Sequence, residues 1–206
     1  MNAWRVLALL LDYPDDELFA HNDELRAIAA TLEPASARAG IEAELERRAA
    51  STVADIQREY VDTFDFAKRC TLYLSFHVYG DRRQRGMAML GLKRAYRAAG
   101  LELADGALPD HLPAALEFTG CAPEAGIEVL CGFRPALELV RAALHAEESP
   151  YGALLDAVCA LLPKATRAEL EDARRIAAEG PPEEMVGLEP FAPPEVMPPA
   201  ACGAAR

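Results

Sequence analysis

The sequence is poor in aromatic and β-branched residues. Aromatic side chains make up 7% of the 206 residues, whereas Ala and Leu dominate a hydrophobic fraction of 51%. Ala and Leu are strong helix formers, while β-branched and aromatic residues favour strands. No stretch shows the sustained alternation of apolar and polar residues that is typical of a half-buried strand. The composition therefore predicts an all-α protein.

Positive charge is also scarce. Only 21 Lys and Arg residues stand against 33 Asp and Glu residues, which gives a formal net charge of −12. A surface of this sign repels phosphate backbones, so nucleic-acid binding would need a segregated basic patch. We expect no nucleic-acid partner, and the acidic surface instead favours basic partners.

Paired cysteines are missing, because the chain contains no C-x-x-C motif. The spacing of the cysteines indicates neither a disulfide framework nor a thiolate metal site. We therefore expect most of the cysteines to be small core side chains in a reducing compartment. The five cysteines stand singly at Cys70, Cys121, Cys131, Cys159 and Cys202.

Long apolar runs are absent as well. Met1–Leu11 contains a short apolar run, but Asp12, Pro14 and Asp15 follow directly and no A-x-A cleavage site comes after them. No other stretch approaches the ~20 apolar residues of a membrane-spanning helix. We therefore expect a cytoplasmic protein without stable membrane insertion.

Local motifs for catalysis are not present either. The chain has no G-x-x-x-x-G-K-[ST] or G-x-G-x-x-G phosphate loop, no H-E-x-x-H zinc motif and no G-x-S-x-G nucleophile turn. Its four His residues are far apart in sequence, so nothing local announces a metal site. We expect no catalytic residue, no metal and no enzymatic activity.

Hydrophobic periodicity predicts a single-domain bundle of about eight to ten helices in residues 1–180. Asn2 is placed to cap a first helix through Leu11 that is apolar nearly all round, and Thr166 with Glu169 forms a capping box for the last. The clearest helical period predicts one helix across residues 41–60. Its apolar positions are Ile41, Leu45, Ala49, Val53, Ile56 and Tyr60.

Two clusters combine aromatic and ionisable residues. The first joins Tyr60–Asp65 to Phe76–Asp81, and it is either a core seam between two helices or a functional surface. The second is Leu108–Pro113 followed by Leu116–Phe118. In its structural interpretation, Asp110 is simply the N-cap of a helix that begins there.

The order of several sequence blocks is the strongest indication of function. They resemble the NarJ family of nitrate reductase assembly chaperones, within the TorD/DmsD group of redox-enzyme maturation proteins. Tyr79 departs from the pattern, because a second His is expected there. The blocks are Leu10–Pro14 with Glu17-Leu18, Tyr60–Asp65, His77–Asp81, Arg85-Gly86 with Ala88-Met89, Tyr96, Gly100-Leu101 and Leu108–Phe118.

The resemblance implies a monomeric or dimeric cytosolic chaperone with no cofactor of its own. It would bind the N-terminal peptide of the apo catalytic (alpha) subunit of respiratory nitrate reductase and assist molybdenum cofactor insertion before membrane attachment. An amphipathic peptide needs an apolar groove with acids at its rim. For this groove we expect Tyr60, Phe64, Asp65, His77, Asp110, His111, Leu112, Leu116, Glu117 and Phe118.

Other functions stay open at this stage. One alternative is a client that belongs to another molybdoenzyme or carries a twin-arginine signal peptide. Another is a chain that carries a cofactor or nucleotide, for which Arg82, Arg83 and Arg85 are the candidate phosphate ligands. Residues 181–206 are rich in Pro and are expected to be extended or disordered. The apolar islands Met185–Leu188 and Pro190-Phe191 would either stay disordered or dock on the body, for example over the groove.

Overall fold

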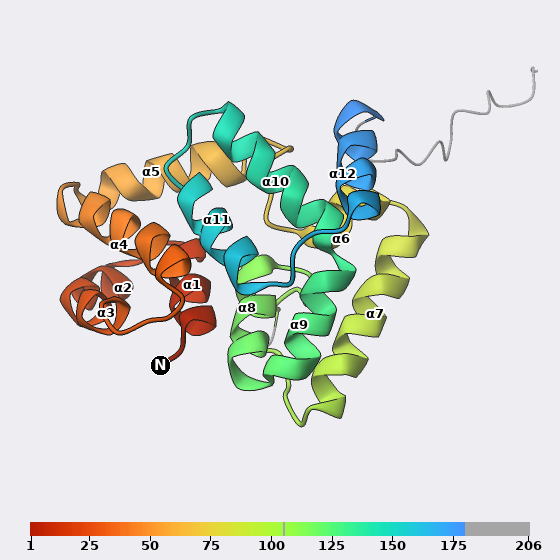
Figure 1. Cartoon of the computed structure of the whole chain (residues 1–206), viewed down its shortest axis with the longest axis horizontal. Coiled ribbons are helices and arrows are strands. Elements are labelled where there is room, and N and C mark those ends of the chain that lie inside the picture. The colour runs from red at the N-terminus through yellow and green to blue at the C-terminus, as the bar shows by residue number, and fades with distance from the viewer. Residues whose placement is uncertain (105, 180–206) are drawn as a thin grey trace, which may run out of the picture.

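The computed structural model describes residues 1–104 and 106–179, which form twelve helices and contain no β-strand (Figure 1). The all-α prediction is confirmed. The predicted Pro-rich tail, residues 181–206, lies outside the described residues. The helices are α1 (Ala3–Leu11), α2 (Asp16–Ala20), α3 (Asn22–Ala29), α4 (Ala35–Ala49), α5 (Val53–Phe64), α6 (Leu74–Tyr79), α7 (Arg83–Ala98), α8 (Leu112–Cys121), α9 (Pro123–Gly132), α10 (Arg134–Ala146), α11 (Gly152–Leu161) and α12 (Arg167–Glu179).

Helix α1 lies at the centre of the bundle. The Asn2 side chain caps it by accepting a hydrogen bond from the Arg5 amide at 3.1 Å, as the sequence predicts. Helices α3, α4, α8 and α11 pack around it. Only Arg5 and Leu9 among its nine residues are not buried, so one narrow face of α1 remains open.

The prediction of one helix across residues 41–60 was wrong. The chain breaks after Ala49, and Thr52 opens α5 by accepting a hydrogen bond from the Asp55 amide at 3.2 Å. A β-hydroxyl residue at this position competes with the helix for backbone donors and so starts a new helix. The apolar period holds in part, because Ile41, Leu45, Ile56 and Tyr60 are buried, whereas Ala49 is exposed at the end of α4. A similar break at His21 separates α2 from α3, and such breaks raise the helix count above eight to ten.

Helices α4 and α11 pack closely against each other in the core. A Cβ at Gly40 would lie 2.3 Å from the Ala153 carbonyl oxygen, so only Gly allows this approach. Beside it, the ring of Phe64 lies 4.8 Å from the rings of both Tyr60 and Tyr151. The start of the first aromatic cluster is therefore a core seam.

Helix α7 lies at the edge of the molecule (Figure 1). Among its sixteen residues only Leu92 and Tyr96 are buried, and its main packing partner is α6. Helix α6 packs in turn on α10, and α10 packs on α12. This order places the end of the described chain on the same side of the bundle as α7.

Candidate functional site

The two sequence clusters lie side by side in the structure. The Leu74 amide donates to the Asp110 carbonyl, and the Leu112 amide donates to the Leu72 carbonyl, both at 2.9 Å. These bonds form an isolated antiparallel bridge between Tyr73 and His111, whose rings are 5.1 Å apart. A segment that precedes α8 is thereby fixed against the start of α6.

Asp110 does not cap α8, so that interpretation was wrong. His111 takes the N-cap position and makes no side-chain cap, because the bridge turns Asp110 toward α6 instead. The fully buried Asp110 carboxylate accepts hydrogen bonds from the Ser75 hydroxyl and from Arg85 Nη2, the latter at 3.4 Å. Asp110 therefore ties α6 and α7 to the segment that leads into α8.

Arg85 is held by more than this carboxylate. Its Nη1 lies 3.5 Å from an Asp81 oxygen, and its guanidinium lies 5.8 Å from the ring centres of both Tyr73 and Phe76. Such contacts with aromatic faces stabilise a partly desolvated cation. Arg85 is thus a structural residue, which removes it from the candidate phosphate ligands.

The structure separates the ten predicted site residues. Asp65 and Glu117 are exposed and His111 is half-buried. Phe64 and Asp65 border a separate hollow of about 190 Å³ beside Lys68 and Arg85. The buried side chains are Tyr60, Phe64, His77, Asp110, Leu112, Leu116 and Phe118.

An open groove of about 520 Å³ lies between α1, α8 and the connector of residues 101–107. Helix α1 supplies one wall through Met1, Arg5, Leu9 and Asp12, which share one helical face together with Ala8. Met1 is 52% exposed and Leu9 is 38% exposed, so apolar surface is open to solvent here. Arg5 and Leu9, the two residues of α1 that are not buried, both lie on this face.

Helix α8 supplies the opposite wall through His111, Pro113, Glu117 and Phe118, with Ala114 and Cys121 on the same face. The Phe118 ring lies 4.2 Å from the Tyr96 ring, and the Tyr96 hydroxyl donates to the Pro109 carbonyl at 2.8 Å. These contacts fix the floor of the groove. Only three predicted site residues line it, namely His111, Glu117 and Phe118.

Acidic side chains edge this groove. Asp12, Glu102 and Glu117 line it, and Arg5 is the one Lys or Arg residue among its lining residues. The α1 wall was not predicted, because the sequence of that helix is apolar nearly all round. The positions of Met1, Arg5 and Asp12, which lie outside the buried stripe of α1, could have indicated this wall.

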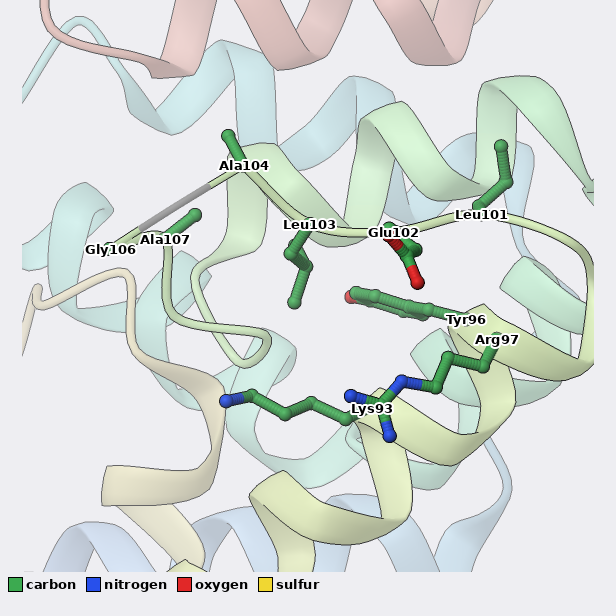
Figure 2. Close-up of a pocket in the computed structure, with 9 residues that line it drawn as sticks. All are labelled: Lys93, Tyr96, Arg97, Leu101, Glu102, Leu103, Ala104, Gly106 and Ala107. Carbon is green, nitrogen blue, oxygen red and sulfur yellow. The ribbon is translucent and has the colours of Figure 1, made fainter.

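A second hollow, of about 280 Å³, lies on the other side of the connector (Figure 2). Lys93, Tyr96 and Arg97 of α7 face Glu102 and Leu103 of the connector across it. The connector therefore separates an acid-edged groove from a hollow that carries two basic side chains.

The imidazoles of His77, which is buried, and His111, which is half-buried, predict a dependence of stability on pH. Burial lowers the pKa of His77, although the hydrogen bond between its ring and the Thr71 carbonyl acts in the opposite direction. Burial also lowers the pKa of His111, although nearby carboxylates favour its protonated form. As the pH falls below the ordinary value of about 6.5, the unfolded chain binds these protons first. The stability is therefore fully present above that pH and is lost below it.

We expect the melting temperature, followed by circular dichroism, to fall between pH 7 and pH 5. In the His77→Gln and His111→Gln variants this fall should be smaller, because one titrating group is gone. Equal slopes in the wild type and both variants would contradict the assignment.

The described residues contain no group of three or more His, Cys, Asp or Glu side chains placed to hold a metal ion. No helix among them is both long enough and apolar enough to span a membrane. An all-α bundle with these sequence blocks defines a domain of the TorD/NarJ-like class.

The chain belongs to the nitrate reductase delta subunit family, whose model matches residues 20–157. It is 36% identical over 154 residues to the nitrate reductase molybdenum cofactor assembly chaperone NarJ of Escherichia coli. The aligned residues are 73% of this chain and 65% of that protein. The chain thus spans slightly less than two thirds of the length of this relative. The resemblance to the NarJ family is confirmed.

Two further relatives are similar over most of the chain. The "Probable nitrate reductase molybdenum cofactor assembly chaperone NarJ" of Bacillus subtilis is 31% identical over 157 residues, which are 76% of this chain and 85% of that protein. The "Probable nitrate reductase molybdenum cofactor assembly chaperone NarW" of Escherichia coli is 32% identical over 162 residues, which are 78% of this chain and 68% of that protein. These relatives are named as chaperones and not as enzymes.

Proposed function

We propose that this protein is an assembly chaperone for a nitrate reductase and acts in the assembly of its molybdenum cofactor. Membership of the family and the names of the relatives support this function. We further propose that it binds the N-terminal peptide of the apo catalytic subunit in the cytoplasm, before that subunit reaches the membrane. The chaperone itself would carry no cofactor and perform no catalysis.

The groove between α1 and α8 is the observation that carries the proposal. Leu9 and Phe118 offer apolar contact from opposite walls, and Asp12 and Glu117 offer negative charge near them. This combination suits an amphipathic helix, whose apolar face enters the groove while its basic residues meet the acids at the edge. The peptide would displace water from the exposed apolar surface of Met1 and Leu9.

The buried members of the predicted site act indirectly in this proposal. Leu112 and Leu116 are fully buried on the inner face of α8, and Asp110 holds the segment before it. These residues set the position of the α8 wall against α1. Gly120 allows the close approach, because a Cβ there would lie 2.4 Å from Arg5 Cγ.

Leu9→Asp should weaken binding of the client's N-terminal peptide by about tenfold or more, because a carboxylate would be desolvated in the apolar centre of the groove. Glu117→Lys should weaken binding by a smaller factor that shrinks as salt rises. Isothermal titration calorimetry measures both affinities. Phe66→Asp is the control, since Phe66 is 77% exposed outside the groove and its replacement should leave the affinity unchanged.

Two outcomes would contradict the proposal at different points. If the wild-type protein fails to bind the peptide at high micromolar concentration, the client assignment is wrong. If it binds and Leu9→Asp matches Phe66→Asp in affinity, the peptide lies elsewhere on the protein.

Twin-arginine signal peptides of other molybdoenzymes, titrated under the same conditions, test the alternative client. Pterin or nucleotide that co-purifies with the protein would favour the alternative of a cofactor carrier.

A further inference from the structure

Helix α7 has the opposite charge to the rest of the protein. Its sixteen residues contain five basic side chains and no acidic one, within a chain whose net charge is −12. Three of the basic residues, Lys93, Arg94 and Arg97, lie exposed in its second half. This helix is the segregated basic patch that the composition alone did not reveal.

The outward face of α7 also carries exposed apolar side chains. Met87, Leu90, Arg94 and Arg97 follow steps of three, four and three, so they form one stripe opposite the buried Leu92. Met87 is 60% exposed and Leu90 is 49% exposed. The stripe thus has an apolar centre and a basic end, which is the pattern of a docking face for an acidic and apolar polypeptide.

Two glycines beside this stripe favour a polypeptide as its occupant. A Cβ added at Gly86 or Gly91 would meet no atom within 4 Å, so packing among the described residues does not require Gly there. Gly inside an exposed helix lowers its stability relative to Ala. A second backbone that approaches α7 closely would use the space that both glycines leave.

We propose that residues 183–197 of this chain dock on the outward face of α7. The segment contains four acidic residues and no basic one, interleaved with large apolar side chains. Its charge and its apolar content complement the stripe. The acids are Glu183, Glu184, Glu189 and Glu195, and the apolar residues are Met185, Val186, Leu188, Phe191, Val196 and Met197.

The segment is long enough to reach α7. Helices α12, α10, α6 and α7 pack one on the next. Three steps of about 8–10 Å between neighbouring axes put α7 within about 30 Å of α12. This sum is an upper limit, which holds if the four helix axes lie in line. An extended chain advances about 3.3 Å per residue, so residues about ten or more positions after Glu179, which include Phe191, reach α7 even at this limit. Because the segment is tethered, docking needs only a modest intrinsic affinity.

Electrostatic repulsion disfavours docking of the segment in the groove between α1 and α8, and it disfavours pairing of two α7 helices. The groove between α1 and α8 is edged by Asp12, Glu102 and Glu117, which would repel the four glutamates of the segment. Two copies of α7 would repel each other in the same way. The hollow beside Lys93 and Arg97, in contrast, adjoins the stripe and offers room for one apolar side chain of the segment (Figure 2).

Photo-cross-linking of the full chain tests this contact. Phe191→benzoylphenylalanine should give adducts within the same chain to residues 83–98, located by mass spectrometry. Arg94→Glu with Arg97→Glu should lower their yield by about tenfold, because two attractions become repulsions. Replacement of the four glutamates of the segment by Lys should restore the cross-linking yield in the Arg94→Glu, Arg97→Glu variant. Arg58→Glu with Arg167→Glu, at exposed positions on other helices, should not change it.

A second variant separates docking from folding. Gly91→Ala should raise the melting temperature through its higher helix propensity and yet lower the cross-linking yield, because its Cβ occupies the space for the second backbone. Adducts to α1 or α8, adducts only between two chains, or a yield insensitive to the charge of α7 would overturn the proposal. The test does not depend on the client peptide, so it stands or falls separately from the proposed chaperone function.

Discussion

Asp110→Ala is expected to lower the free energy of unfolding by about 3–5 kcal/mol, the loss typical of a buried ion pair from which one partner is removed. The substitution leaves Arg85, only 20% exposed, without its buried carboxylate, and it leaves the Ser75 hydroxyl without its acceptor. It also frees the segment before α8 from α6 and α7. Urea denaturation followed by circular dichroism measures the change.

The matched controls separate charge from hydrogen bonding. Asp110→Asn keeps the size and an acceptor oxygen for Ser75, so it should cost less than Asp110→Ala. Ser75→Ala removes one neutral donor and should cost about 1 kcal/mol. If all three variants unfold at the urea concentration of the wild type, Asp110 does not hold these elements together. Its burial would then need another explanation.

Glu44→Ala is expected to have an effect of similar size, about 3–5 kcal/mol. Glu44 is 2% exposed and accepts from Arg48 Nε at 2.8 Å, while Arg48 is 1% exposed. Without Glu44, the Arg48 guanidinium still donates a hydrogen bond to the Leu10 carbonyl at 2.9 Å, which carries no full negative charge. A buried cation is then left without a countercharge, at the contact between α4 and α1.

The opposite substitution should be milder. In Arg48→Met the Glu44 carboxylate keeps its hydrogen bonds from Arg47, at 2.8 and 2.9 Å, and Met fills most of the space. We therefore expect a smaller loss from Arg48→Met than from Glu44→Ala, and a double variant that is more stable than Glu44→Ala alone. Arg167→Ala is an exposed control, since its pair with Glu171 is 92% and 57% exposed. It should change stability by less than about 1 kcal/mol. Equal losses from Glu44→Ala and Arg48→Met would contradict the argument.

Local chemistry predicted much of the fold. Asn2 caps α1 as expected, and Thr166 and Glu169 form the expected capping box, with the Glu169 amide 3.3 Å from the Thr166 hydroxyl. Such bonds join residues three positions apart, so the sequence contains all the information they need. The inward stripe of Ile41, Leu45 and Ile56 was also predicted correctly. Its division into two helices was not, because a helical period does not report a break between helices that face the same core.

The candidate site could be predicted only in part. The segment around Asp110 was singled out for the peptide groove, but the Asp110 side chain is buried and accepts hydrogen bonds from Ser75 and Arg85, which are 35 and 25 residues away. His111 and Glu117 do line the groove, since a face of α8 follows from helical spacing alone. The opposite wall comes from Leu9 on α1, about a hundred residues earlier. Sequence spacing cannot show that these two helices become neighbours.

The sequence by itself determined that the protein is helical, where its first and its last described helix begin, and which family its blocks resemble. These properties depend on contacts between residues that are near in the chain, or on the order of the blocks. The tertiary structure alone decided which face of α1 stays open and that Asp110 turns inward. It also decided that Lys93, Arg94 and Arg97 of α7 lie exposed on an otherwise acidic protein. Each of these depends on which helices pack together, and that is settled by long-range burial and not by local preference.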